Sequence, residues 1–151
     1  MKSHLLDFRP PRIAMLLILI AALTHWSLSL DSPGPLGART FAPVPALVGF
    51  AIMISAWWQF RQSGIAICPT ARTEGLITKG VYQYTRNPMY LGMVMMLCGV
   101  ALFFGSFPYY LAAATLFAIL NWVFCPYEES KLRSTFGEHY VAYTDTACRW
   151  I

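Results

Sequence analysis

Charged side chains are scarce in this sequence, and their scarcity excludes an ordinary water-soluble domain. Only 12 % of the 151 residues are charged, whereas 57 % are hydrophobic. A soluble domain of this size carries about a quarter charged residues, and one soluble core of this length could not hide so much apolar surface. The composition therefore predicts a single integral membrane domain over residues 1–151.

Paired cysteines and a basic cluster are also missing. The four cysteines form no CxxC pair, and none has metal-ligand spacing with a histidine. Cys98 and Cys125 lie in apolar runs, and Cys68 and Cys148 lie outside them. We therefore expect free cysteines, no disulfide and no metal. The net charge is +4, but the basic residues are scattered beside apolar segments, so we expect no nucleic-acid partner.

Long apolar runs are what the sequence has in their place. Each of four runs is long enough to cross a hydrocarbon core of about 30 Å as a helix: residues 13–30, 44–60, 89–107 and 109–124. Only Pro108 separates the last two runs, and proline fits the first turn of a helix. The sequence thus predicts an all-α membrane bundle of about four transmembrane helices that includes a tight C-terminal helical hairpin.

The positions of the basic residues predict how this bundle is oriented. With four spans, Arg39 is the only Lys or Arg on one side of the membrane. The positive-inside rule then makes the other side cytoplasmic, with both termini and the active site on it. We expect a bacterial inner-membrane protein. The first run is too long for a signal peptide and no A-x-A site follows it, so we expect a retained signal anchor.

The first polar segment, residues 73–92, ends in a candidate anion site. Its sequence is TEGLITKGVYQYTRNPMYLG, in which Asn87 fits a helix N-cap and Pro88 the first helical position. A helix N-terminus beside Arg86 suits a carboxylate or a phosphate. The alternative is that Arg86 only extends to the membrane interface and that Asn87 and Pro88 only begin a helix.

The second polar segment, residues 126–151, begins with two adjacent carboxylates. Glu128 and Glu129 follow the fourth run directly, where they are costly unless they are solvated or partnered. The alternative to a site is a solvated helix face on which Glu128 pairs with Lys131 or Arg133.

A cytosolic amphipathic C-terminal helix is predicted after these carboxylates. Leu132, Phe136, Tyr140 and Tyr143 recur at helical spacing and form an apolar stripe. Such a stripe more often packs against a bundle than binds a cofactor. Gly137 interrupts the helix at a cost of about 1 kcal/mol against alanine, which indicates a helix break or a close backbone approach.

The hairpin should bring the two polar segments together, because it returns the chain to the membrane face that it left. An arginine, a helix N-terminus, two carboxylates and several tyrosines would then share one pocket. S-adenosylmethionine is one ligand that fits such a pocket: Arg86 or the helix N-terminus can bind its carboxylate, a glutamate its ammonium, and aromatic rings its adenine or sulfonium.

The same residues carry a family resemblance. GVYQYTRNPMYLG followed by EESKLRSTFGEHYVAYTDTACRW resembles the isoprenylcysteine carboxyl methyltransferase and phospholipid methyltransferase family. Members have an arginine-histidine-proline-x-tyrosine-x-glycine motif, a glutamate pair, a phenylalanine-glycine-x-x-tyrosine-x-x-tyrosine run and an arginine-tryptophan ending. The likeness covers residues 76–150. Asn87 stands where the family often has histidine, and FCPY replaces the basic residues that commonly precede the glutamate pair.

The resemblance implies an S-adenosylmethionine-dependent methyltransferase. The acceptor would be lipophilic or small, with a carboxylate, thiol or amine as the nucleophile, and it would enter laterally from membrane lipid. Arg86 and Glu129 are the expected catalytic residues. Cofactor contacts are expected from Lys79, Gly80, Val81, Tyr82, Arg86, Asn87, Pro88, Tyr90, Gly92, Glu128, Glu129, Phe136, Tyr140 and Tyr143.

Two other functions fit parts of the pattern. Membrane sterol-type reductases that use NADPH show a similar arginine-x-proline-x-tyrosine stretch, although this chain is short for them and lacks an evident basic cluster for the extra phosphate. A non-catalytic membrane adaptor is the second alternative, since Asn87 departs from the family motif.

Overall fold

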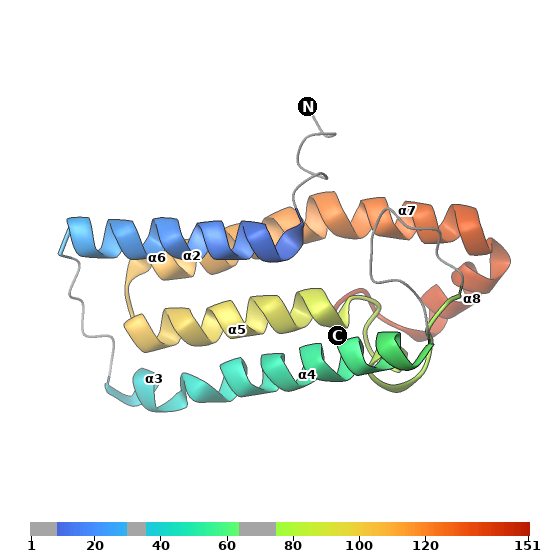
Figure 1. Ribbon diagram of the computed structural model, residues 1–151, viewed down its shortest axis with the longest axis horizontal. Helices are drawn as coiled ribbons and strands as arrows, with labels where there is room; N and C mark the ends of the chain where they lie inside the picture. Colours follow the sequence, from blue (N-terminus) through green and yellow to red (C-terminus); the bar gives the residue numbers. More distant parts are fainter. Residues whose placement is uncertain (1–8, 30–35, 64–74) are drawn as a thin grey trace.

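A computed structural model of the chain describes residues 9–29, 36–63 and 75–151. Long helices lie side by side along one direction, with both polar segments at one end (Figure 1). The described residues contain no strand beyond one isolated bridge, so the all-α prediction is confirmed. The helices are α2 (Pro10–Ser27), α3 (Leu36–Phe41), α4 (Pro43–Ser63), α5 (Pro88–Phe104), α6 (Phe107–Ile119), α7 (Cys125–Phe136) and α8 (Glu138–Thr146).

The hairpin forms at the predicted place, with small shifts at its ends. Helix α5 stops at Phe104 because Gly105 adopts a left-handed backbone conformation, with φ of 66°. Helix α6 then begins at Phe107, and Pro108 lies in its first turn, where the missing N–H is no loss. The two helices run back antiparallel to each other (Figure 1).

The sequence predicts that the last apolar run ends at Phe124, but in the structure the helix continues beyond this residue. A π-helical turn (Leu120–Phe124) joins α6 to α7 without a break. The helical rod therefore carries Glu128 and Glu129 beyond the apolar run on a rigid extension. This continuity matters for the site, because it fixes both carboxylates relative to the membrane-spanning part.

The helices are suited to a bilayer. Within the described residues, three helical stretches are long and apolar enough to cross a membrane, while α5 is shorter at 17 residues. Large apolar side chains point outward, among them Trp26 at 78 % exposed, Met15 at 71 % and Trp122 at 68 %. Such a surface is covered by lipid in an integral membrane protein.

Helices α4 and α5 approach each other through glycines, a contact that the sequence analysis missed. A Cβ atom added at Gly49 would lie 2.6 Å from the Gly92 carbonyl oxygen, and one at Gly92 would lie 2.5 Å from the Gly49 oxygen. Farther along, Gly99 faces Ala46 and Ala42 equally closely. Small residues let backbones meet in this way.

We expect Gly49→Val to lower the thermal unfolding midpoint in detergent, because the new side chain collides with the α5 backbone. Overpacking of this kind typically costs about 1–3 kcal/mol. Ala51→Val is the matched control, since Ala51 lies on the exposed face of α4. Equal midpoints for the two variants would contradict the close glycine contact.

Candidate active site

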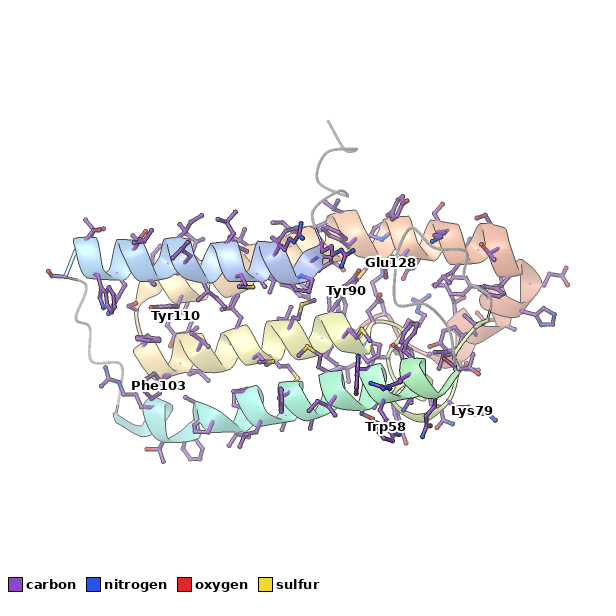
Figure 2. All side chains as sticks on the ribbon, viewed as in Figure 1. Trp58, Lys79, Tyr90, Phe103, Tyr110 and Glu128 are labelled. Carbon is purple, nitrogen blue, oxygen red and sulfur yellow. The ribbon has the colours of Figure 1, made fainter. Side chains whose placement is uncertain are left out.

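The two polar segments meet at one end of the bundle, as the sequence analysis predicted. A guanidinium nitrogen (NH2) of Arg86 lies 3.6 Å from Oε1 of Glu129. The Tyr90 hydroxyl, on the first turn of α5, donates a hydrogen bond to Oε1 of Glu128 on α7. Figure 2 shows Tyr90 and Glu128 pointing toward each other across the gap between these helices. The α5–α6 hairpin therefore brings the two polar segments together.

Glu129 has a second and closer partner, Arg149. Arg149 Nε donates to Oε1 of Glu129 at 2.9 Å, and its NH2 group donates to Oε2 at 2.6 Å. This two-point geometry is among the stronger polar contacts of proteins. Arg149 was not among the predicted site residues. The arginine-tryptophan ending of the resemblance was the signal that pointed to it.

Residues 147–151, which we name the C-terminal strap, lie against the start of α5. Thr85 and Cys148 form a parallel bridge, and the Arg86 amide donates to the Cys148 carbonyl at 2.9 Å. The Thr85 hydroxyl and the Asn87 amide group both donate to the Arg149 carbonyl, at 3.2 and 3.1 Å. The strap is thus held by backbone and side-chain bonds around Arg149.

The end of the strap is anchored on the π-helical turn. Trp150 Nε1 donates to Oδ1 of Asn121 at 3.0 Å, and the Trp150 ring lies 5.0 Å from the Phe117 ring. A polar Asn121 within an apolar helix would otherwise be costly. The sequence analysis gave Asn121 no role.

Asn87 is the N-cap residue of α5, but its side chain makes no capping bond. The predicted N-cap position is therefore confirmed, while the side-chain capping hydrogen bond is not formed. The Asn87 amide group instead reaches the strap carbonyl of Arg149, while the Asn87 backbone N–H donates to the Thr85 hydroxyl at 3.2 Å. The Asn87 side chain therefore binds the Arg149 carbonyl of the strap and does not cap α5.

The aromatic stripe of the C-terminal helix packs as its spacing predicts. Tyr140, Tyr143 and Ala147 form a buried cluster, with Leu76, Leu132 and Phe136 packed against it. The Tyr143 hydroxyl also donates to the Tyr82 carbonyl at 2.6 Å, and burial raises the pKa of Tyr143 to about 12. The stripe therefore locks α8 onto the 3-10 turn (Gly80–Gln83).

Gly137 separates α7 from α8 as a helix break. Its φ of 53° is a conformation that side-chain-bearing residues rarely adopt, and a Cβ there would meet nothing within 4 Å. Of the two readings left open by the sequence, the break is correct and the close backbone approach is not.

The remaining predicted site residues lie at varied places. Pro88 is buried at the start of α5, Val81 is half-buried and Gly80 adjoins the Gln59 side chain of α4. The Lys79 side chain is exposed and lies away from the Tyr90–Glu128 pair (Figure 2). Gly92 faces α4. Whether these residues touch a cofactor stays a prediction.

The charges of the site are unevenly satisfied. Burial raises the pKa of Glu128 above its ordinary value, although the Tyr90 hydrogen bond and the charge of Lys131 oppose this. Nε of Arg86 is buried without a hydrogen-bond partner among the described residues, and the buried Tyr140 hydroxyl has no partner there other than the neighbouring Arg86 guanidinium. Unpaired buried donors are uncommon in folded proteins, so this corner of the site suits an incoming acceptor group such as a carboxylate.

No group of His, Cys, Asp and Glu among the described residues could hold a metal. Cys98, Cys125 and Cys148 are free thiols. Cys68, which we expected to be free as well, lies outside the described residues.

Comparison with known proteins decides the family. Residues 38–139 match the family described as phospholipid methyltransferase. The chain belongs to this family. The matched range contains Arg86, Tyr90, Glu128 and Glu129, and it ends before the C-terminal strap.

Several relatives of this family member carry one name, protein-S-isoprenylcysteine O-methyltransferase. The Schizosaccharomyces pombe protein is 31 % identical over 102 residues, which cover 64 % of this chain and 42 % of the relative. Form B of Arabidopsis thaliana is 38 % identical over 72 residues, or 45 % of this chain and 34 % of that protein. Form A is 29 % identical over 150 residues, or 95 % and 74 %.

This family member thus spans less than half the length of the first two of these relatives. No solved structure matches the chain.

The raised pKa of Glu128 predicts how stability depends on pH. Because folding favours the protonated carboxyl, its stabilising contribution is full below about pH 4.3, the ordinary glutamate pKa, and is lost as pH rises through the raised value. We expect the thermal midpoint of wild type, measured relative to Glu128→Gln, to fall from pH 4 toward pH 8. Glu138→Gln, at an exposed position, should show no such difference. Parallel curves for wild type and Glu128→Gln would contradict the burial of this carboxyl.

Proposed function

We propose that the protein is a membrane-embedded S-adenosylmethionine-dependent methyltransferase that methylates a lipophilic acid, of the isoprenylcysteine type. The observation that carries this is a cluster in a member of the phospholipid methyltransferase family: Arg86, with one buried nitrogen unpaired, lies 3.6 Å from Glu129, while Tyr90 binds the adjacent Glu128. The names of the three relatives favour transfer to oxygen. Neither a reductase nor an adaptor finds comparable support.

The residues present fit the charges of this cofactor. Nε of Arg86 offers an unpaired donor to its carboxylate, and the Tyr140 hydroxyl, beside the Arg86 guanidinium, can donate its own hydrogen. Glu128, which accepts from Tyr90, can receive its ammonium group. Arg86 and Arg149 both lie at Glu129, and Glu128 is the adjacent residue on the same helix, so the four charged groups are close to one another. The cofactor supplies a methyl group on a positively charged sulfur when it is bound.

The protein's part in the reaction is alignment and exclusion of water. A carboxylate acceptor is already ionised at neutral pH and needs no general base. This agrees with Asn87, which cannot act as a base and whose amide group is committed to the strap. The absence of the histidine common in the family is therefore compatible with transfer to a carboxylate. An amine acceptor would instead require a base, for which Glu128 or Glu129 is the candidate.

The acceptor reaches the site from the bilayer in this proposal, because a lipophilic acid is already concentrated there. The site lies at the end of the bundle opposite α3, the helix that carries Arg39, while Arg61 is in the last turn of α4 (Figure 1). By the positive-inside rule this end is cytoplasmic. We also keep the bacterial inner membrane as the proposed location.

Calorimetric titration of the detergent-purified protein with S-adenosylhomocysteine tests cofactor binding. We expect wild type to bind and Arg86→Met to bind about tenfold or more weakly, the loss typical for a hydrogen bond to a charged group. Arg133→Met is the control, because Arg133 is an exposed arginine on α7. Absence of heat from wild type, or equal affinities for wild type and Arg86→Met, would count against the proposal.

The class of acceptor is tested by label transfer. Purified protein in lipid is incubated with methyl-labelled S-adenosylmethionine and an N-acylated S-prenylcysteine, and the product is treated with alkali. We expect an alkali-labile label, as a methyl ester gives. An alkali-stable product would refute the carboxylate acceptor, and cofactor binding without any product would favour the non-catalytic adaptor.

A further inference from the structure

Two arginines compete for one carboxylate in this site. Arg149 binds both oxygens of Glu129, at 2.9 and 2.6 Å. Arg86 approaches the same Oε1 atom, but at 3.6 Å it is beyond hydrogen-bonding distance. Because a two-point contact between guanidinium and carboxylate is stronger than one long ion pair, Arg149 holds Glu129 and Arg86 does not.

Because Arg86 does not hold Glu129, its guanidinium keeps an unpaired donor. Nε of Arg86 has no hydrogen-bond partner among the described residues, although the Arg86 side chain is only 16 % exposed. The Tyr140 hydroxyl, on a residue 1 % exposed, has no partner among the described residues other than the neighbouring Arg86 guanidinium. Buried donors without partners destabilise a protein unless something else satisfies them.

Arg149 is held in place through its backbone as well as its side chain. Thr85 and Asn87 donate two hydrogen bonds to its carbonyl oxygen, and the neighbouring Trp150 is tied to Asn121. The backbone of Arg149 is therefore anchored where its guanidinium can reach Glu129. Its neighbours Cys148 and Trp150 contribute to this anchoring.

We propose that Arg149 is a positioning residue: by occupying both oxygens of Glu129, it prevents Arg86 from closing on that carboxylate and leaves Arg86 available for a carboxylate on the ligand. This inference rests on the proposed function, since it takes the ligand to be S-adenosylmethionine or its product. The inference also assigns different roles to the two adjacent glutamates. Glu129 serves the strap, and Glu128 receives the ligand's ammonium group.

Removing Arg149 should therefore damage the recognition of one ligand group selectively. In Arg149→Met, Arg86 can move onto Glu129 and form the closer ion pair. We expect S-adenosylhomocysteine to bind about tenfold or more weakly. An analogue that lacks only the carboxylate, 5′-deoxy-5′-(3-aminopropylthio)adenosine, should keep its affinity for Arg149→Met within about twofold of that for wild type. Arg133→Met should change neither affinity.

A second substitution separates positioning from general structural damage. In Arg149→Met combined with Glu129→Gln, Arg86 no longer has a competing carboxylate. We expect the affinity for S-adenosylhomocysteine to recover to within about threefold of wild type, a difference of less than one hydrogen bond to a charged group. Glu129→Gln alone should retain the preference for the ligand that carries the carboxylate. This single variant keeps the test available if the strap variants fold poorly.

Hydrogen exchange reports on the strap independently. The Arg86 amide donates to the Cys148 carbonyl, so its exchange should quicken in Arg149→Met and stay unchanged in Glu128→Gln.

Three results would overturn the inference. They are equal weakening of both probes in Arg149→Met, further loss on adding Glu129→Gln, and a loss of about tenfold or more for both ammonium-bearing probes in Glu129→Gln alone. A wild-type protein that binds neither probe refutes the proposed function itself, and the inference with it.

Discussion

Two adjacent carboxylates leave the bilayer on one rigid helix, and their neutralisation governs the rest of the site. Glu128 and Glu129 follow the π-helical turn at the end of the apolar run, where an unpartnered charge is costly. Each of the two carboxylates has a different partner. Tyr90 of α5 reaches Glu128, and Arg149 of the C-terminal strap reaches Glu129. These two contacts join the start of α5, the start of α7 and the end of the chain.

The membrane-spanning part supplies the precision that these contacts need. Helix α5 is fixed against α4 by a glycine contact that leaves no room for a methyl group. It is fixed against α6 by the turn at Gly105. With both neighbours set, the first turn of α5 faces α7 at hydrogen-bonding distance. A site built from rigid helix ends holds its geometry better than one built on loops.

Patterns of local origin were readable from the sequence. Apolar runs predicted the spans, prolines predicted helix starts, and the single proline between two runs predicted the hairpin that brings Arg86 and Glu129 together. The apolar stripe also predicted the packing of Tyr140 and Tyr143. Each of these follows from composition or spacing over a few residues.

Contacts set by tertiary packing were not readable. Arg149 lies 20 residues beyond its partner Glu129, and the chain between them is redirected at Gly137 and again at the strap. Asn87 looked like a helix cap, but the strap carbonyl offered its side chain a better partner. The glycine contact depends on which faces of α4 and α5 meet, and the sequence alone does not fix this.

The most direct measurement is an experimental structure of the protein in lipid with S-adenosylhomocysteine bound. The account predicts the ligand carboxylate within hydrogen-bonding distance of Arg86 and its ammonium at Glu128, with Arg149 still bound to both oxygens of Glu129. A ligand ammonium seated on Glu129, with Arg149 displaced from it, would contradict the account.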